Sequence, residues 1–340
     1  MKFARSYLSV LSVVLTVLLF TACGGGGDDS SVVTDTTTGV SITPTNAKAI
    51  SAKAVSSVDT VEGSTTAADF VTGVSISLPD SGFTYPELVL RQLERLPTLA
   101  SQSDTGSVTG AVTSETFDCT DGGTVTLTAD VVDPNALTVG DTITVSYNNC
   151  TESGVVLNGA MSITMTEVTG TLDGIPPYAL GFKVIFTSLS MSDGSLVVTT
   201  DGDMSMRLSD DGTGNESLLL SGNAFTTSTA DVVESMTNYR YDFEVNSISG
   251  AYSLDMQGTI NSTEIGGSVS FVTLETFTGN DFGVTDNPTA GVLLITGIDN
   301  SQARVTAQPD GTNVQIEVDA DGDGMFETII MTTWTELESL

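Results

Sequence analysis

Apolar and polar residues alternate along most of the chain from residue 105 onward. In residues 124–131 the apolar positions are Val125, Leu127, Ala129 and Val131, and Thr or Asp stands between them. The same alternation recurs in residues 141–148, 161–165, 204–208, 239–245, 252–256 and 314–318. A period of two is typical of antiparallel strands that pack one face on a core and turn the other to water.

Turn-forming residues separate these segments. The dipeptides Asp-Gly and Asn-Gly favour tight hairpin turns, and they occur at residues 121–122, 158–159, 173–174, 211–212 and 310–311. Roughly a dozen or more strands joined in this way predict an all-β domain over residues 105–340. We expect an antiparallel meander that closes as a barrel, a half-barrel or a large sandwich.

Two segments precede this domain. In residues 67–104, Leu88, Val89, Leu93 and Leu96 recur at three-to-four spacing before Pro97. That spacing predicts one short amphipathic helix that packs on the β domain. Residues 24–66 are rich in Gly, Ser, Thr and Asp without a sustained apolar period. They predict a flexible tether within a segment that spans residues 23–66.

The first 22 residues have the pattern of an export signal. Lys2 and Arg5 precede an apolar run over residues 7–20, which is too short for a permanent transmembrane helix. The junction Leu-Phe-Thr-Ala-Cys resembles the lipobox of bacterial lipoproteins, although Phe20 departs from the usual leucine. The resemblance implies cleavage after residue 22 and acylation of Cys23, with palmitate among the acyl chains. An ordinary cleaved signal is the alternative.

The resemblance also implies a cellular location. Two or more acyl chains give stable membrane anchoring, and Gly24 stands where an aspartate would imply retention in the inner membrane. We therefore expect a chain anchored by lipid in the outer membrane, on the periplasmic face or at the cell surface.

The chain is strongly acidic. Its net charge is −33, and Lys2 and Arg5 are the only charged residues before Cys23, so the mature chain carries −35. Such a charge repels nucleic acid and attracts cations. The hydrophobic fraction of 39% is large enough for a core, so the acidity indicates a solvated surface or a cation-binding face.

Two cysteines remain once Cys23 is assigned to lipid. Cys119 and Cys150 are an even pair in a chain that we expect to be exported, and disulfides persist outside the cytosol. We predict a Cys119–Cys150 disulfide, with two buried thiols as the alternative.

The residue types present limit the available chemistry. The chain contains no histidine, which excludes Ser-His-Asp and Cys-His nucleophile systems and the usual catalytic zinc sites. A carboxylate pair, as in glycoside hydrolases, is the enzyme class left open. No particular pair stands out among 43 acidic residues, and we expect a non-enzymatic protein.

One acidic segment, DADGDGMFE at residues 319–327, has the spacing of a metal loop. Aspartates at alternate positions before Gly324 match the first half of an EF-hand loop, but Ile330 stands where the closing glutamate would be. Strand-like segments flank it, so it resembles the calcium loops that bacterial surface proteins carry between strands. The resemblance implies a structural calcium ion bound by the side chains of Asp319, Asp321, Asp323 and Glu327 and the carbonyl of Met325. A plain acidic hairpin turn is the alternative.

Several stretches together resemble uncharacterised lipoproteins of Gram-negative bacteria. They are FDCTDGGTVTLT (117–128), VGDTITVSYNNC (139–150) and VDADGDGMFET (318–328), behind a CGGGGDD start. We expect a lipid-anchored surface lipoprotein with a role in binding, adhesion or envelope structure. Its partners are then the membrane and a protein, glycan or lipid ligand, and no nucleic acid.

A second hypothesis is a carrier of lipid or another apolar ligand. A rolled sheet can enclose an apolar cavity, and methionines form adaptable linings. The methionines that fall on predicted strand faces are Met161, Met165, Met204, Met206 and Met256. A carboxylate-based glycoside hydrolase is the third hypothesis.

Overall fold

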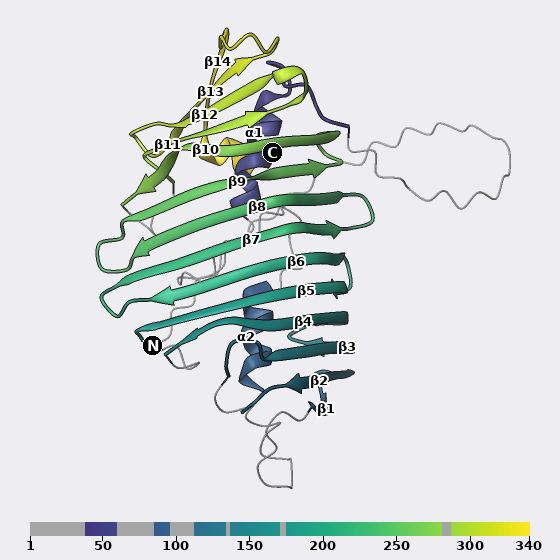
Figure 1. Cartoon of the computed structure of the whole chain (residues 1–340). Helices are drawn as coiled ribbons and strands as arrows, with labels where there is room; N and C mark the ends of the chain where they lie inside the picture. The colour runs from purple at the N-terminus through teal and green to yellow at the C-terminus, as the bar shows by residue number, and fades with distance from the viewer. Residues whose placement is uncertain (1–37, 60–84, 96–111, 134–136, 171–174, 281–286) are drawn as a thin grey trace, which may run out of the picture. The chain divides into compact units, whose positions relative to one another are not determined.

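The chain folds as one antiparallel sheet of fourteen strands in a computed structural model, which describes residues 38–59, 85–95, 112–133, 137–170, 175–280 and 287–340. Each strand pairs with the next one along the chain (Figure 1). The predicted all-β meander is confirmed, and the sheet remains open, as a half-barrel requires. The strands are β1 (Val112–Asp118), β2 (Thr124–Asp130), β3 (Thr142–Glu152), β4 (Val155–Thr169), β5 (Tyr178–Ser192), β6 (Val197–Asp210), β7 (Asn215–Ser228), β8 (Val233–Asn246), β9 (Tyr252–Ser262), β10 (Gly267–Gly279), β11 (Ala290–Thr296), β12 (Gln302–Ala307), β13 (Asn313–Asp319) and β14 (Thr328–Thr333).

The alternation in the sequence corresponds to the two faces of this sheet. Val125, Leu127 and Ala129 of β2 are fully buried, and the Thr residues between them are half-buried. The same pattern holds in β12 and β13, where every second residue is buried. We call the buried side the inner face and the opposite side the outer face. The core of the protein is therefore a layer on one side of a single sheet.

One of the five predicted turn signals lies inside a strand. The turns at residues 121–122, 211–212 and 310–311 are confirmed between strands, and residues 173–174 lie outside the described residues. The prediction at Asn158-Gly159 is wrong, because both residues belong to β4 and the register with β5 shifts there. Gly159 has φ +91°, and a Cβ atom would lie 2.1 Å from the Ser188 carbonyl oxygen. The dipeptide marks a β-bulge, which also needs a left-handed backbone.

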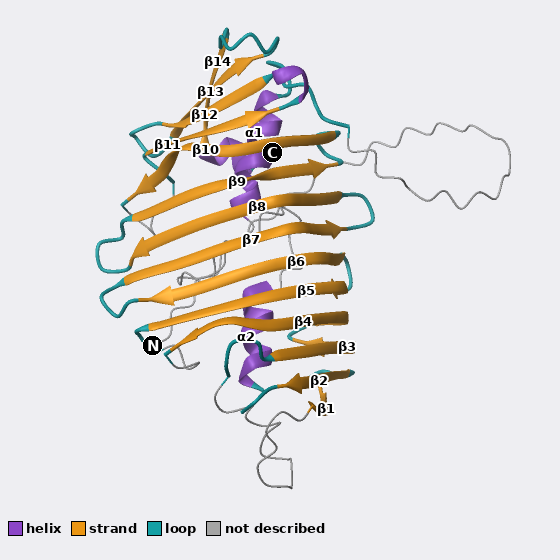
Figure 2. Cartoon of the chain, viewed as in Figure 1, coloured by secondary structure: helices purple, strands orange, loops and turns teal. Residues whose placement is uncertain are grey.

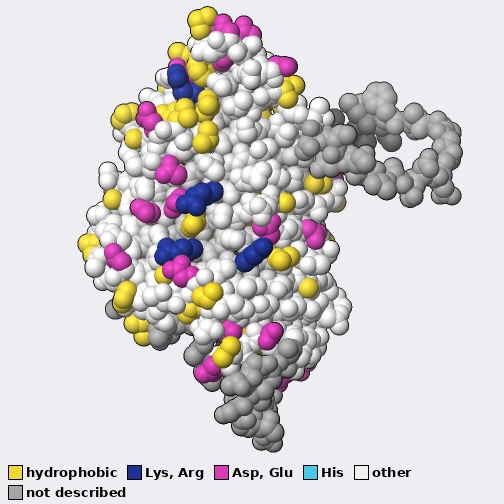
Figure 3. All heavy atoms as spheres, in the orientation of Figure 1, with side chains coloured by type: hydrophobic (Ala, Val, Ile, Leu, Met, Phe, Trp, Pro, Cys, Tyr) yellow, Lys and Arg dark blue, Asp and Glu magenta, His cyan; other side chains and the backbone are white. Residues whose placement is uncertain are grey.

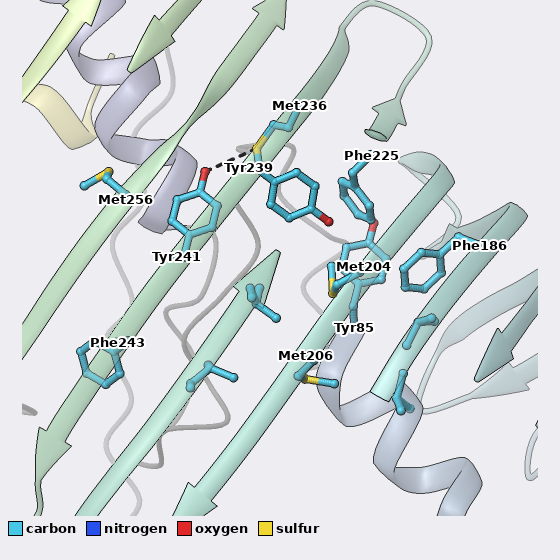
Figure 4. Close-up of a cluster of buried hydrophobic side chains, with 14 of the residues drawn as sticks. Tyr85, Phe186, Met204, Met206, Phe225, Met236, Tyr239, Tyr241, Phe243 and Met256 are labelled. Atoms are coloured by element: carbon cyan, nitrogen blue, oxygen red, sulfur yellow. Dashed lines mark hydrogen bonds between the residues drawn. The ribbon is translucent and has the colours of Figure 1, made fainter. Parts of the chain in front are cut away.

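Two helices lie on the inner face (Figures 1 and 2). The predicted amphipathic helix is α2 (Tyr85–Glu94), and its Leu88 and Val89 are buried. The Tyr85 ring packs edge-on against Phe186 and Phe225, at centroid distances of 5.2 and 5.4 Å (Figure 4). Its hydroxyl shares a buried hydrogen bond with Thr200 of β6. Tyr85, at the start of α2, therefore reaches β5, β6 and β7, and the rest of the helix lies behind β2–β5 (Figure 1).

The other helix corrects the predicted tether. Residues 47–59 form α1 (Ala47–Asp59), so the flexible segment expected over residues 23–66 does not include them. Residues 23–37 and 60–66 lie outside the described residues. α1 contacts β12, β13 and the C-terminal helix α4 (Trp334–Glu338). Its buried residues are mostly small, which lets the helix approach the sheet closely but leaves little apolar period in the sequence.

A buried ion pair connects α1 to the middle of the sheet. The Lys53 ammonium donates to a Glu234 carboxylate oxygen at 2.5 Å, and it also pairs with Glu264. Burial alone would lower the pKa of Lys53, but hydrogen bonds and charge from both glutamates raise it above its ordinary value. The contribution of this ion pair to the free energy of unfolding is therefore fully present below the ordinary lysine pKa. It is lost only as the pH rises through the raised pKa of Lys53.

Replacing Lys53 with methionine should destabilise the fold, because Glu234 is fully buried and would lose the positive charge of its Lys53 partner. We expect a loss of about 3–5 kcal/mol in the free energy of unfolding, measured by denaturant titration. Lys48→Met is the matched control on the same helix. Its ion pair with Glu336 is exposed, so the loss should be about 0–1 kcal/mol. Equal effects of the two substitutions would contradict this account.

Candidate functional site

The acidic segment 319–327 forms the turn between β13 and β14. Asp319 ends β13 and is 1% exposed, whereas Asp321 and Asp323 lie in the exposed part of the turn. Gly322 has φ +76°, and a Cβ atom there would lie 2.3 Å from the carbonyl oxygen of Asp299. Only glycine fits both the left-handed backbone and this close approach.

The aspartates hold the turn together through its own backbone. Asp319 accepts hydrogen bonds from the Gly322 amide at 2.7 Å and from the Gly324 amide at 2.8 Å. Asp323 accepts one from the Met325 amide at 2.8 Å. Hydrogen bonds from backbone amides to Asp side chains are a common way of stabilising a turn, so the loop is held in part by its own side chains.

The same turn brings three of the predicted metal ligands together. One carboxylate oxygen from each of Asp319, Asp321 and Asp323 lies within 4.8 Å of the others. Glu327 does not belong to this group, and Met325, whose backbone carbonyl is the fifth predicted ligand, is a 64% exposed residue of the turn. Calcium takes six to eight oxygen ligands, so three aspartates supply part of a coordination shell. The rest would have to come from backbone carbonyls and water.

The predicted disulfide is present. Cys119 and Cys150 are bonded, and their Cα atoms are 5.4 Å apart. The bond joins the turn after β1 to β3, and the Glu152 carboxylate lies beside it. Oxidised sulfur is a poor metal ligand compared with thiolate, so this second group of potential ligands is a structural crosslink.

A groove of about 620 Å³ lies at one end of strands β4–β9. Its lining combines Asp210, Asp211, Asn215 and Glu216, which lie close together in the sequence, with Tyr178, Glu244 and Tyr252, which were not predicted from the sequence. Tyr178 is opposite Asp210 in the register, and Asp210 is opposite Glu216. The position of Tyr178 beside the two acids is evident only once the register is known, because Tyr178 is distant from them in the sequence.

The groove has an acidic character. Burial first, and then the charges of Asp210 and Glu216, raise the pKa of Tyr178. Hydrogen bonds from Thr213 and Asn215 lower the pKa of Asp211. The residues that line the groove include four carboxylates and neither Lys nor Arg, so it attracts cations. Asp210 and Glu216 also occupy neighbouring strand positions, as the hydrolase hypothesis requires, but the register alone assigns them no reaction.

The predicted lipidation site lies outside the described residues. Cys23 and the signal segment 1–22 fall before residue 38, so their chemistry remains a sequence-based prediction. Among the described residues, none of the helices has the length and apolar character needed to cross a membrane.

Comparison with known protein families, curated proteins and solved structures finds no match.

Calcium should bind at the acidic turn and stabilise the fold. At about 100 times its dissociation constant, a ligand specific for the folded state adds about 2.7 kcal/mol to the free energy of unfolding. We expect calorimetric titration to show saturable binding and thermal melts to rise relative to chelator. Both effects should disappear in an Asp321→Ala, Asp323→Ala variant.

The matched control is Asp118→Ala with Asp231→Ala, which removes two exposed carboxylates elsewhere. If the turn variant still bound calcium, or if the control lost binding to the same extent, the binding would be diffuse attraction of calcium to an acidic surface. No binding at millimolar calcium would identify a hairpin turn held by its own hydrogen bonds.

Proposed function

We propose that the protein is a lipid-anchored lipoprotein of the outer membrane with a non-enzymatic role in binding, adhesion or envelope structure. The observation that carries the proposal is the filled inner face. Side chains from both ends and the middle of the sheet, such as Val125, Phe225 and Ile316, are at most 1% exposed. The surface available to a partner is therefore the polar outer face and the loops.

The chemistry of that surface supports a role without catalysis. The chain has no histidine, and Lys183 is exposed on the outer face of β5. The strand-end groove and the β13–β14 turn gather acids that favour cations over nucleic acid or anionic lipid. In this proposal a calcium ion at Asp319, Asp321 and Asp323 stabilises the turn, and it takes no part in a reaction.

The anchor is tested by replacing Cys23 with serine. A full chain with Cys23 should incorporate labelled palmitate and sediment with outer membranes, because several acyl chains hold a protein on a bilayer. Cys23→Ser should lose the label and leave the membrane fraction. Thr21→Ser, two residues away, is the control and should retain both properties. Membrane association that is unchanged in Cys23→Ser would refute the anchor.

A second candidate function, a carrier of an apolar ligand, is favoured by one feature of the inner face. Its centre is rich in methionine and aromatic side chains, including Met204, Met206, Met256, Tyr241 and Phe243 (Figure 4). Flexible thioethers can repack around a ligand. All five predicted methionines point to this face, where they are 1–4% exposed. Buried methionine is equally suited to filling a core, so the carrier is the second candidate.

The two candidates differ in what accompanies the purified protein. A carrier isolated from membranes should release stoichiometric apolar molecules on solvent extraction, and Met206→Trp with Met256→Trp should reduce that yield by occupying the space. A scaffold or adhesin should release none from its folded domain beyond the Cys23 acyl chains, which remain covalently attached. Detection by mass spectrometry, with an exposed Met331→Trp variant as the control, distinguishes these outcomes.

A further inference from the structure

The last strand of the sheet, β14, has an edge to which none of the other described strands pairs. It pairs with β13 on one side and ends the strand order. Apart from the β13 pairing, none of the backbone hydrogen bonds among the described residues involves residues 328–333. A row of free N–H and C=O groups of this kind is a template for another strand. The question is therefore what occupies it.

The composition of β14 is unusual for an edge in this protein. Residues 328–333 read Thr-Ile-Ile-Met-Thr-Thr and contain no charge, although the chain carries 43 acidic residues. Edge strands are commonly protected from pairing by charge, proline or a bulge, and β14 has no charge or proline and pairs with β13 without a register shift. β1, at the other end of the strand order, carries Glu115 and Asp118.

The outer face of β14 is also apolar. Ile329 and Met331 are 60% and 57% exposed. Hydrophobic side chains gather on the surface over β10–β14 (Figure 3), where Val272 and Leu274 of β10 are 39% and 55% exposed. Arg304 pairs with Glu317 beside Ile329 in the register. The exposed apolar side chains thus extend from the free edge onto the neighbouring strands.

We propose that β14 is an association site for a second copy of this chain, which adds its own β14 in antiparallel orientation. A twofold axis normal to the sheet places the inner faces of both copies on the same side. The pairing must then set even-numbered residues opposite even-numbered residues and odd-numbered residues opposite odd-numbered ones. With Ile330 opposite itself, Ile329 of each copy lies opposite Met331 of the other on the outer face. Aromatic and aliphatic cross-strand pairs of this kind stabilise a sheet.

The choice of a second copy follows from charge. Two chains of net charge −33 repel each other almost everywhere on their surfaces, and β14 offers six successive uncharged residues at which they can meet. The strand also offers no charge for the recognition of an unlike partner. The acidic 319–327 turn of one copy approaches α4 of the other in this arrangement, so added salt should strengthen the association by screening.

The test compares variants of the full chain in mild detergent by sedimentation velocity across a range of concentrations. We expect a dimer that dissociates on dilution. Ile329→Lys with Met331→Lys places lysines opposite each other across the junction, which is destabilising, and should weaken dimerisation ~10-fold or more. Ile185→Lys with Val233→Lys is the control, because it adds the same charge at exposed positions of β5 and β8, away from β14, and should leave dimerisation unchanged.

Crosslinking tests the pairing register. Ile329→Cys mixed with Met331→Cys should form a disulfide-linked dimer on mild oxidation, whereas either variant alone should not, because identical residues would be about 7–8 Å apart on the diagonal. A chain that is monomeric at every concentration, or a dimer that the double lysine variant does not weaken, would overturn the proposal. So would a monomer whose binding to zwitterionic lipid vesicles falls in that variant, since the occupant would then be lipid.

Discussion

The structure depends on covering the apolar face of an open sheet. Fourteen strands with alternating residues place one continuous apolar layer on the inner face, and a sheet that does not close cannot cover that layer with itself. α1 and α2 contact this layer at separate places, through buried side chains and through Tyr85–Thr200 and Lys53–Glu234. The helices are therefore part of the core, and the ion pair fixes α1 against the strands.

The strands could be predicted from the sequence because their chemistry is local. Each buried position of β2 or β13 alternates with a polar one, and each partner strand follows directly in the chain. α2 was also predictable, because its leucines recur at helical spacing. α1 was not, since alanine and serine fit a close helix–sheet contact without forming an apolar period. Asn158-Gly159 was wrongly predicted as a turn, because tight turns and β-bulges both use glycine in a left-handed backbone conformation.

The candidate site could also be predicted only in part from the sequence. Alternate aspartates identified the 319–327 turn, and the turn does gather three of them, yet the position of Glu327 outside the group depends on how the chain leaves the loop. The disulfide followed from the number of cysteines. The strand-end groove did not follow from the sequence, because Tyr178, Asp210 and Glu216 meet only through the strand register.

The long-range contacts of α1 impose an order on folding. Neighbouring strands form local pairs, so the sheet can grow hairpin by hairpin along the chain. α1 comes first in the sequence, but the partners of its two lysines lie 181 and 288 residues later. During synthesis, α1 cannot reach these partners until nearly the whole sheet has been made. α1 therefore docks late although it is made early. Until it docks, an incomplete chain exposes part of its apolar inner face to chaperones and proteases.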